Sequence, residues 1–167
     1  RRLNGGGGKL KNRVLNTMGC EWDMIKPTKE YFEELFRVSK NQIIWGGNYF
    51  DLPPTRCIIC WDKVQPWENF SQWEMAWTSF DKPAAMFRLS NTGGANKDKK
   101  IHPTQKPVKL YKWLLSKFAA EGDKILDTHA GSLSIGIACE QMGFSLDAVE
   151  LSEDYYNSSI LRFNESI

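Results

Sequence analysis

The stretch that most constrains the fold is residues 124–143, KILDTHAGSLSIGIACEQMG. It predicts a short buried strand over 124–128, a loop of small residues, and a helix over about 133–142. A second strand over 145–150 and a second helix over about 153–165 follow, with Ser152 as the predicted helix cap. Alternation of this kind is typical of α/β proteins, in which helices cover a parallel sheet and ligands bind at the carboxyl ends of the strands.

Two acidic residues flank the predicted ligand loop. Asp127 ends the first strand and Glu150 ends the next. An acid in the second position accepts hydrogen bonds from ribose hydroxyls in doubly wound folds, so Glu150 favours a ribose-bearing ligand. The glycine spacing that cradles a pyrophosphate is absent, because Leu133 and Ser134 stand where further glycines belong. The loop therefore indicates an adenosine-type ligand without phosphates, and S-adenosylmethionine is the candidate cofactor.

The remainder of the chain predicts helices and strands in a different order. A helix is expected within 27–40 and another from Pro107 to Gly122, with four strands between them. The expected strands lie within 41–50, 56–63, 72–79 and 85–90, the last two as a hairpin-like pair. In the third of these, Trp73, Met75 and Trp77 alternate with Glu74 and Ala76, which predicts one buried face.

Composition and charge narrow the class of protein. No apolar run is long enough to span a membrane and no signal peptide opens the chain, so we expect a cytoplasmic location. The net charge is only +2, but basic residues gather in 1–13 and again in 97–106. Basic loops on a nearly neutral body, with seven tryptophans, suit a nucleic-acid partner and equally suit solvated loops.

The cysteines do not form a recognisable metal or disulfide pattern. Cys57 and Cys60 make a CxxC within a predicted strand, where side chains three apart point to opposite faces. No second CxxC completes a zinc site. We therefore expect buried apolar thiols and no metal.

The segment HPTQKP at 102–107, followed by a helix and then LDTHAGSLSIGIACEQMGF and AVELSEDYYNSSILRF, resembles the prokaryotic and phage DNA amino-methyltransferases. The order of these segments is that of the permuted, beta-type members, which are N6-adenine or N4-cytosine specific. QIIWGGNYF, CIICWDK and EMAWTSF are similar to later segments of the family's catalytic half, so the resemblance covers about residues 20–165.

The resemblance implies a Rossmann-like S-adenosylmethionine-dependent methyltransferase fold, α/β, with a mostly parallel sheet flanked by helices and an antiparallel strand pair. It implies a single domain over 1–167, made of a catalytic half (20–90), a basic loop (91–106) and a cofactor-binding half (107–167). The methionine end of the cofactor would contact Pro103, Thr104, Gln105 and Lys106. The rest of the cofactor would contact Asp127, Thr128, His129, Ala130, Gly131 and Ser132, with Glu150 on the ribose.

Further candidates come from the catalytic half. The wall of a base pocket would include Trp45, Gly47, Asn48 and Tyr49, although a structural role for this strand end is equally open. In the basic loop, Lys97, Lys99 and Lys100, together with the basic run of 1–13, are candidates for phosphate contacts, although for any single lysine a solvated surface role is the more common one.

The sequence also departs from the family. Thr128-His129 replaces the usual Pro-Phe, and Leu133 stands where a second glycine is common. The catalytic tetrad, Asp/Asn/Ser-Pro-Pro-Tyr/Phe, is not in this chain; DLPP at 51–54 lacks the aromatic and we interpret it as a turn. The fold is therefore expected to be N-terminally incomplete, and the catalytic residues are unknown.

The function that the resemblance implies is methyl transfer from S-adenosylmethionine to the exocyclic amine of a base in double-stranded DNA, adenine N6 rather than cytosine N4. Such enzymes serve restriction–modification, beside a restriction endonuclease, or act alone, as in phages. A catalytically incomplete remnant that only binds DNA or cofactor is the alternative, and a dehydrogenase is a third possibility. A cytosine-C5 enzyme is excluded because no cysteine follows a proline.

Overall fold

The computed structural model describes residues 26–65, 69–90 and 98–167, and the described chain forms two units, divided after Val38. The first unit contains the helix α1 (Lys29–Val38), at whose start the Thr28 hydroxyl accepts a hydrogen bond from the Tyr31 amide at 3.4 Å. This is the helix predicted within 27–40. The predictions for Cys20 and the basic residues of 1–13 lie outside the described residues.

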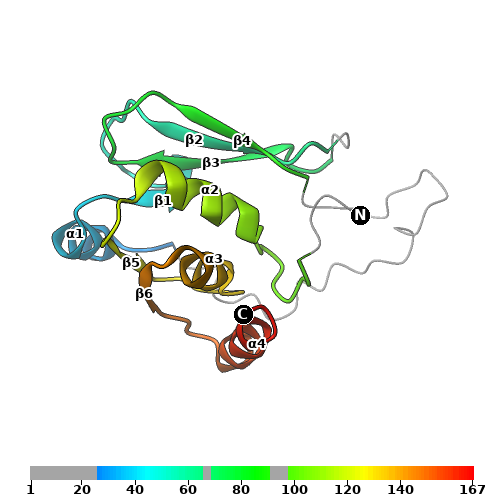
Figure 1. Cartoon of the computed structure of the whole chain (residues 1–167). Coiled ribbons are helices and arrows are strands. Elements are labelled where there is room, and N and C mark those ends of the chain that lie inside the picture. The colour runs from blue at the N-terminus through cyan, green and yellow to red at the C-terminus, as the bar shows by residue number, and fades with distance from the viewer. Residues whose placement is uncertain (1–25, 66–68, 91–97) are drawn as a thin grey trace. The chain divides into compact units, whose positions relative to one another are not determined.

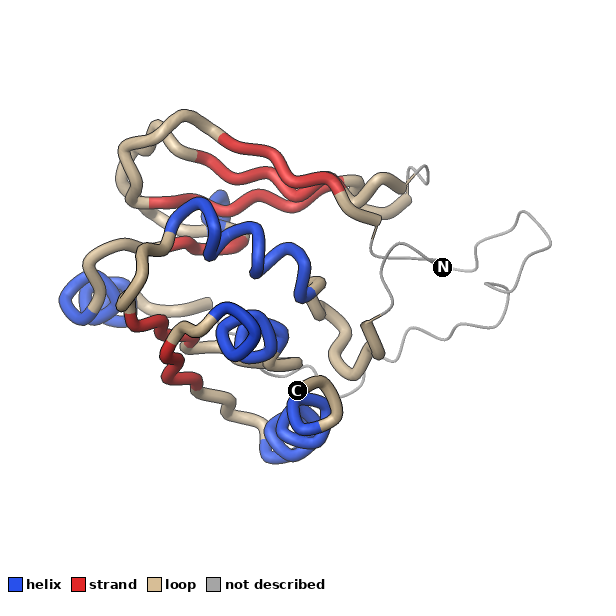
Figure 2. The backbone as a smooth tube through the Cα atoms, viewed as in Figure 1, coloured by secondary structure: helices blue, strands red, loops and turns tan. Residues whose placement is uncertain are grey.

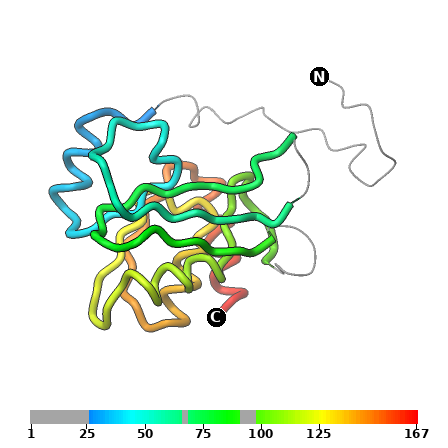
Figure 3. The backbone as a smooth tube through the Cα atoms, turned by 90° about the horizontal axis from the view of Figure 1, so that it is seen from above, coloured from blue at the N-terminus to red at the C-terminus, as the bar shows by residue number. Residues whose placement is uncertain are grey.

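The second unit begins with a four-stranded sheet in the order β1-β3-β2-β4 (Figure 1). Its strands are β1 (Ile43–Trp45), β2 (Ile58–Asp62), β3 (Trp73–Thr78) and β4 (Ala85–Arg88), and a short 3-10 helix, η2 (Gly47–Tyr49), follows β1. Seen from above in Figure 3, the longer strands run side by side. The four strands predicted in this region are all present.

The pairing of these strands corrects two predictions. β3 is antiparallel to both β1 and β2, whereas β2 and β4 are parallel, so the sheet is mixed rather than mostly parallel. β4 is not the hairpin partner of β3, because the connection after Thr78 crosses the start of β2, where the Cys57 thiol lies 3.5 Å from the Pro83 carbonyl oxygen.

The predicted burial of β3 on one face is also wrong. Trp73 is 52% exposed, whereas Ala76 is completely buried and Trp77 is 7% exposed. Both faces are covered in the C-terminal half of the strand, because Ala76 packs on the helix α2 and the Trp77 indole donates to the Pro53 carbonyl at 2.7 Å. As predicted, the DLPP segment contains no helix or strand. Through the contact of Pro53 with Trp77 it covers one side of the sheet.

The last third of the chain matches the predicted alternation closely. It consists of α2 (Val108–Phe118), β5 (Lys124–Asp127), α3 (Ser134–Met142), β6 (Ser145–Ala148) and α4 (Glu153–Asn164). β5 and β6 are parallel and form a second sheet (Figure 2). The Ser152 hydroxyl accepts from the Tyr155 amide at 3.4 Å, which confirms Ser152 as the cap of α4.

The core lies on two sides of α2. Leu110 and Leu114 pack on Ile59, Trp61 and Ala76 of the four-stranded sheet. Val108 and Leu115, on another side of the helix, pack on Ile137, Ala138 and Cys139 of α3. In Figure 1, α2 accordingly lies between the four-stranded sheet and α3, and it brings segments from both parts of the second unit together.

Two further predictions concern the burial of the cysteines and the absence of a membrane-spanning segment. Cys57 is completely buried, Cys60 is partly buried, and both are free thiols. Within 26–65, 69–90 and 98–167, no helix combines the length and apolar character that a membrane crossing requires.

Candidate functional site

The loop after β5 is a tight corner built by backbone hydrogen bonds. The Val149 amide donates to the Asp127 carbonyl at 2.8 Å, and the Ala130 amide donates to the Val149 carbonyl at 2.9 Å, so the parallel pairing continues beyond the strands. The chain then turns through Gly131, at φ +52°, and Leu133, at φ +55°. The Leu133 amide closes the turn on the Ala130 carbonyl at 2.8 Å.

The departure from the family at Leu133 has a structural explanation. Leu133 adopts the left-handed conformation that glycine reaches without cost and that an L side chain rarely adopts. Its side chain is buried and fills the space above Gly136, where an added Cβ would lie 2.7 Å from the Leu133 Cγ. The burial of Leu133 thus offsets its backbone strain, and it needs the glycine at 136 to do so.

Glu150 points its carboxylate into this loop. One oxygen, Oε2, accepts from the Gly131 amide at 2.7 Å, and the other, Oε1, accepts from the Ser152 amide at 2.9 Å. Because each carboxylate oxygen has two lone-pair directions, both retain capacity for another donor. The partly buried carboxylate therefore joins the loop to the start of α4 and can still accept hydroxyl groups.

Asp127 lies at the other end of the loop. Its Oδ1 accepts from the His129 amide at 3.0 Å, and the Thr128 hydroxyl lies 3.0 Å from His129 Nδ1. Burial raises the pKa of the Asp127 carboxyl, and the hydrogen bond from the His129 amide and the charge of Lys106 offset this only in part. A donor placed against this carboxylate would lower its pKa again.

The segment 102–106 lies against the same loop. His102 is 8% exposed, and its ring contacts the Tyr155 ring in a tilted arrangement with centroids 4.2 Å apart. The ring also faces Gly131, where an added Cβ would lie 3.7 Å from it. The Thr104 hydroxyl and amide lie 3.1 and 3.3 Å from His102 Nδ1. Burial lowers the pKa of His102, although the charge of Glu150 opposes this, so a neutral ring is favoured at pH 7.

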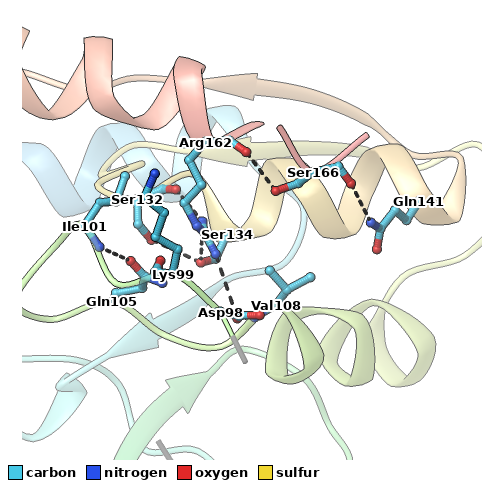
Figure 4. A network of polar contacts seen from close by, with 10 residues as sticks. All are labelled: Asp98, Lys99, Ile101, Gln105, Val108, Ser132, Ser134, Gln141, Arg162 and Ser166. Atoms are coloured by element: carbon cyan, nitrogen blue, oxygen red, sulfur yellow. Dashed lines mark hydrogen bonds and ion pairs between the residues drawn. The ribbon is translucent and has the colours of Figure 1, made fainter. Parts of the chain in front are cut away.

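Two of the polar side chains predicted to hold the cofactor's methionine end, Gln105 and Lys106, make contacts within the protein. Gln105 accepts from the Ile101 amide and donates to the Lys99 carbonyl, both at 2.9 Å (Figure 4). Lys106 pairs with Glu74 of β3 at 3.1 Å and lies 4.9 Å above the centre of the Trp45 ring. Pro103 and Thr104 are exposed.

Glu74 is a shared partner for two largely buried lysines. Lys63 and Lys106 have side chains that are 13% exposed, and both contact the Glu74 carboxylate, Lys63 at 2.6 Å. Burial opposes the charged form of Glu74, but the charges and hydrogen bonds of the two lysines outweigh it and lower its pKa. This cluster fastens segment 102–106 to the four-stranded sheet.

We expect Glu74→Gln to lower the free energy of unfolding at pH 7 by about 1–3 kcal/mol, because two lysines lose a charged partner. A lowered carboxyl pKa stabilises the fold above the unfolded-state pKa and is lost as the pH falls through the folded-state value. The difference between variant and parent should therefore shrink below about pH 4.5. Urea unfolding at pH 7 and pH 4 measures it, with Asp81→Asn as control, since the pair of Asp81 with Arg56 is exposed. Equal losses in both variants would contradict the assignment.

The remaining predicted site residues are distributed unevenly. Trp45 is partly buried. Gly47 is buried, and an added Cβ there would lie 2.4 Å from the Trp77 Cβ, which gives this glycine a structural role. Asn48 and Tyr49 are exposed. Lys100 is exposed, Lys99 pairs with Glu165 at 3.4 Å, and Lys97 lies outside the described residues.

Other residues that lie against the loop after β5 were not predicted from the sequence. The His102 ring lies beside Gly131 and contacts Tyr155, and the buried Arg162 contacts Ser132. One signal was available: Tyr155, Ser159 and Arg162 recur at helical spacing along the predicted last helix, on a face that turns inward.

The comparisons with known proteins decide the family. A family model described as DNA methylase, for N6 and N4 methyltransferases, matches residues 19–161. The chain belongs to this family. The Type II methyltransferase M.HpaI of Haemophilus parainfluenzae is 32% identical over 73 residues, 44% of this chain and 23% of that protein. M2.MboI of Moraxella bovis, another Type II methyltransferase, is 24% identical over 92% of this chain and 50% of that protein. The chain thus spans half or less of these relatives.

Solved structures of methyltransferases share the fold. The M1.HpyAVI complex with S-adenosylmethionine aligns with a TM-score of 0.54 at 18% identity, over 83% of this chain and 72% of that one. The cytosine-N4-specific PvuII DNA methyltransferase aligns with a TM-score of 0.50 at 18% identity, over 64% of this chain and 50% of that one. The chain therefore has the Rossmann-like α/β fold that the sequence predicted, with a mixed sheet.

Proposed function

We propose that this DNA methylase binds S-adenosylmethionine between residues 102–106 and the loop 127–132, and that it serves methyl transfer to the exocyclic amine of a DNA base, adenine N6 in the first instance. The observation that carries the proposal is the position of Glu150, whose carboxylate lies 2.7 Å from the Gly131 amide and so at the centre of the loop. The choice of adenine over cytosine follows the family resemblance alone.

The residues present fit an adenosine-type cofactor. Both oxygens of Glu150 have spare lone pairs for the two ribose hydroxyls. Gly131 has no side chain that would block a ligand from approaching the loop. The His102 ring lies beside Gly131 and contacts Tyr155. Charge-assisted hydrogen bonds of this kind contribute about 1.5–3 kcal/mol each.

The methionine end is assigned to the exposed edge of segment 102–106. Pro103 and Thr104 are open to solvent there, whereas Gln105 and Lys106 shape the segment through their contacts with Ile101, Lys99 and Glu74. Burial raises the pKa of the Asp127 carboxyl, and we assign this group to accept a hydrogen bond from the cofactor. His129 serves as a loop residue and not as a general base.

S-adenosylmethionine supplies an electrophilic methyl group when it is bound. The protein's task is then to hold the base amine in line and to accept hydrogen bonds from its N–H groups, with the base flipped out of the duplex. The sequence contains no Asp/Asn/Ser-Pro-Pro-Tyr/Phe tetrad, so no catalytic residue is assigned within 1–167. Trp45, Asn48 and Tyr49 remain proposed walls of the base pocket.

DNA is the proposed macromolecular partner. Lys100 is exposed, and the Lys99 ammonium forms an exposed ion pair with Glu165, which a phosphate can replace at little cost. Binding through lysine–phosphate contacts falls steeply with salt concentration. The division into a catalytic half (20–90), a basic loop (91–106) and a cofactor-binding half (107–167) is part of this proposal.

Calorimetric titration of the 167-residue chain with S-adenosylmethionine, beside NAD, tests the proposal. We expect saturable binding of S-adenosylmethionine and none of NAD, because the loop lacks the glycines that approach a pyrophosphate. Binding of NAD in preference would contradict the proposal and favour a dehydrogenase.

The second candidate is a protein that binds cofactor or DNA without methyl transfer, which the missing tetrad favours. Incubation with labelled S-adenosylmethionine and duplex DNA, followed by mass analysis of the released nucleosides, separates the two candidates. Methylated adenine supports the first, methylated cytosine corrects its base, and cofactor binding without any methylated base supports the second.

A further inference from the structure

Arg162 is a buried cation directly behind the proposed cofactor loop. It lies on α4, is 4% exposed, and donates from Nη1 to the Ser132 carbonyl at 2.7 Å and to the Ser134 hydroxyl at 3.1 Å (Figure 4). The Ser132 and Ser134 hydroxyls lie 3.1 Å apart. One guanidinium nitrogen therefore holds both sides of the corner at Leu133.

The other terminal nitrogen of Arg162 points to a different segment. Nη2 lies 3.8 Å from Asp98 Oδ2, and the same oxygen accepts from the Val108 amide at 2.8 Å (Figure 4). Val108 is the first residue of α2, so Asp98 caps that helix directly after segment 102–106. Arg162 thus pairs the loop after β5 with Asp98, which precedes HPTQKP, and through Asp98 it is linked to Val108, which follows it.

This arrangement suits arginine specifically. A guanidinium is a planar fork whose nitrogens donate in fixed directions, so it sets the separation of the groups that it contacts. A lysine at this position would offer a single point charge on a flexible stem. The two segments bridged by Arg162 are those proposed to hold the two ends of the cofactor.

We propose that Arg162 is a positioning residue that fixes the distance between segment 98–108 and the loop 127–134, and with it the distance between the methionine and adenosine ends of the binding site. It acts through the Ser132 carbonyl and Asp98 and does not touch the cofactor. The statement about the binding site rests on the proposed function, whereas the statement about the two segments does not.

Hydrogen exchange of the ligand-free chain tests the positioning of the segments. In Arg162→Met, we expect amides within 98–108 and 128–136 to exchange at least about 10-fold faster, with no change in β2 and β3. The control is Lys99→Met, which removes an exposed ion pair with Glu165 just after α4 and should leave exchange unchanged. No change in Arg162→Met, or a uniform increase that includes β2 and β3, would overturn the proposal.

Ligand binding tests the consequence for the site. We expect Arg162→Met to raise the Kd for S-adenosylmethionine by about 10-fold or more and the Kd for adenosine by a factor at least about 3-fold smaller, because adenosine depends on the loop but not on its distance from segment 98–108. Equal losses for both ligands would overturn the positioning role at the site. Should Arg162→Met not fold, Asp98→Asn replaces it, because an asparagine oxygen keeps the cap on Val108 while the charge pair is lost.

The two experiments separate the two proposals. If exchange is faster in Arg162→Met but the parent chain does not bind S-adenosylmethionine, the proposed function is contradicted and the positioning of the two segments is still supported. Binding of S-adenosylmethionine to the parent with no effect of Arg162→Met on exchange or on Kd sinks the positioning role alone.

Discussion

Glu150→Gln is expected to weaken the binding of S-adenosylmethionine by about 1.5–3 kcal/mol, which is roughly a 10- to 150-fold rise in Kd. The amide of glutamine has one oxygen where the carboxylate has two, and its NH₂ group would face either the Gly131 or the Ser152 amide. The variant thus loses an acceptor for ribose and introduces a donor opposite a donor. Calorimetry of parent and variant measures the change.

The control for Glu150→Gln is Glu140→Gln. Glu140 lies exposed on α3, away from the loop contacts described for Glu150, and its replacement should leave the Kd unchanged. Unchanged affinity in Glu150→Gln, with a folded protein, would show that the ribose does not bind at this carboxylate.

Leu110→Ala is expected to lower the free energy of unfolding of the second unit by about 2–5 kcal/mol. Leu110 is completely buried between α2 and the four-stranded sheet, against Ile59 and Trp61, so truncation removes apolar contacts and leaves a cavity. The loss is large because α2 also supports α3, and through it the loop that carries the proposed site. Urea unfolding followed by tryptophan fluorescence measures it.

Leu161→Ala provides the matched control for this core prediction. Leu161 is 59% exposed on α4, and the same substitution there should change the free energy of unfolding by less than about 0.5 kcal/mol. A loss at Leu110 no larger than the loss at Leu161 would contradict the placement of α2 at the centre of the core.

Local patterns in the sequence predicted the elements well. The strands and helices of residues 124–164 lie where hydrophobic periodicity and the Ser152 cap placed them, and α1 and α2 start close to Pro27 and Pro107. These features depend on neighbours a few residues away, which the sequence presents directly. Asp127 lies at the end of β5, as predicted, and Glu150 lies two residues after the end of β6; their roles at the cofactor stay predictions.

Contacts between distant segments explain what the sequence did not predict. The partner of β4 is β2, and Trp77 is covered by the Pro53 carbonyl, and neither contact leaves a trace in local periodicity. Lys106 stays a predicted contact of the cofactor's methionine end, but its ion pair with Glu74 on β3 could not be predicted from the sequence. The role of Arg162 depends on Asp98 and Ser132, which only the folded chain brings together.

The chain matches half or less of the length of its curated relatives, so its own activity has to be tested separately from theirs. The described residues include the proposed cofactor loop, its acid and its supporting arginine, whereas no catalytic tetrad is in the sequence. Cofactor binding is therefore the property to establish before methyl transfer.

The most direct test of the central claim is the amide resonance of Gly131 in a chain labelled with ¹⁵N-glycine, titrated with S-adenosylmethionine. The Gly131 amide donates to Glu150, so a ribose bound at that carboxylate should shift its signal, which is identified by its loss in Gly131→Ala. Gly122 and Gly143 lie in turns with nothing within 4 Å of an added Cβ and should remain in place. A saturable shift of Gly131 alone among these three is the predicted result, and a Gly131 signal that stays unmoved at saturating cofactor would contradict the account.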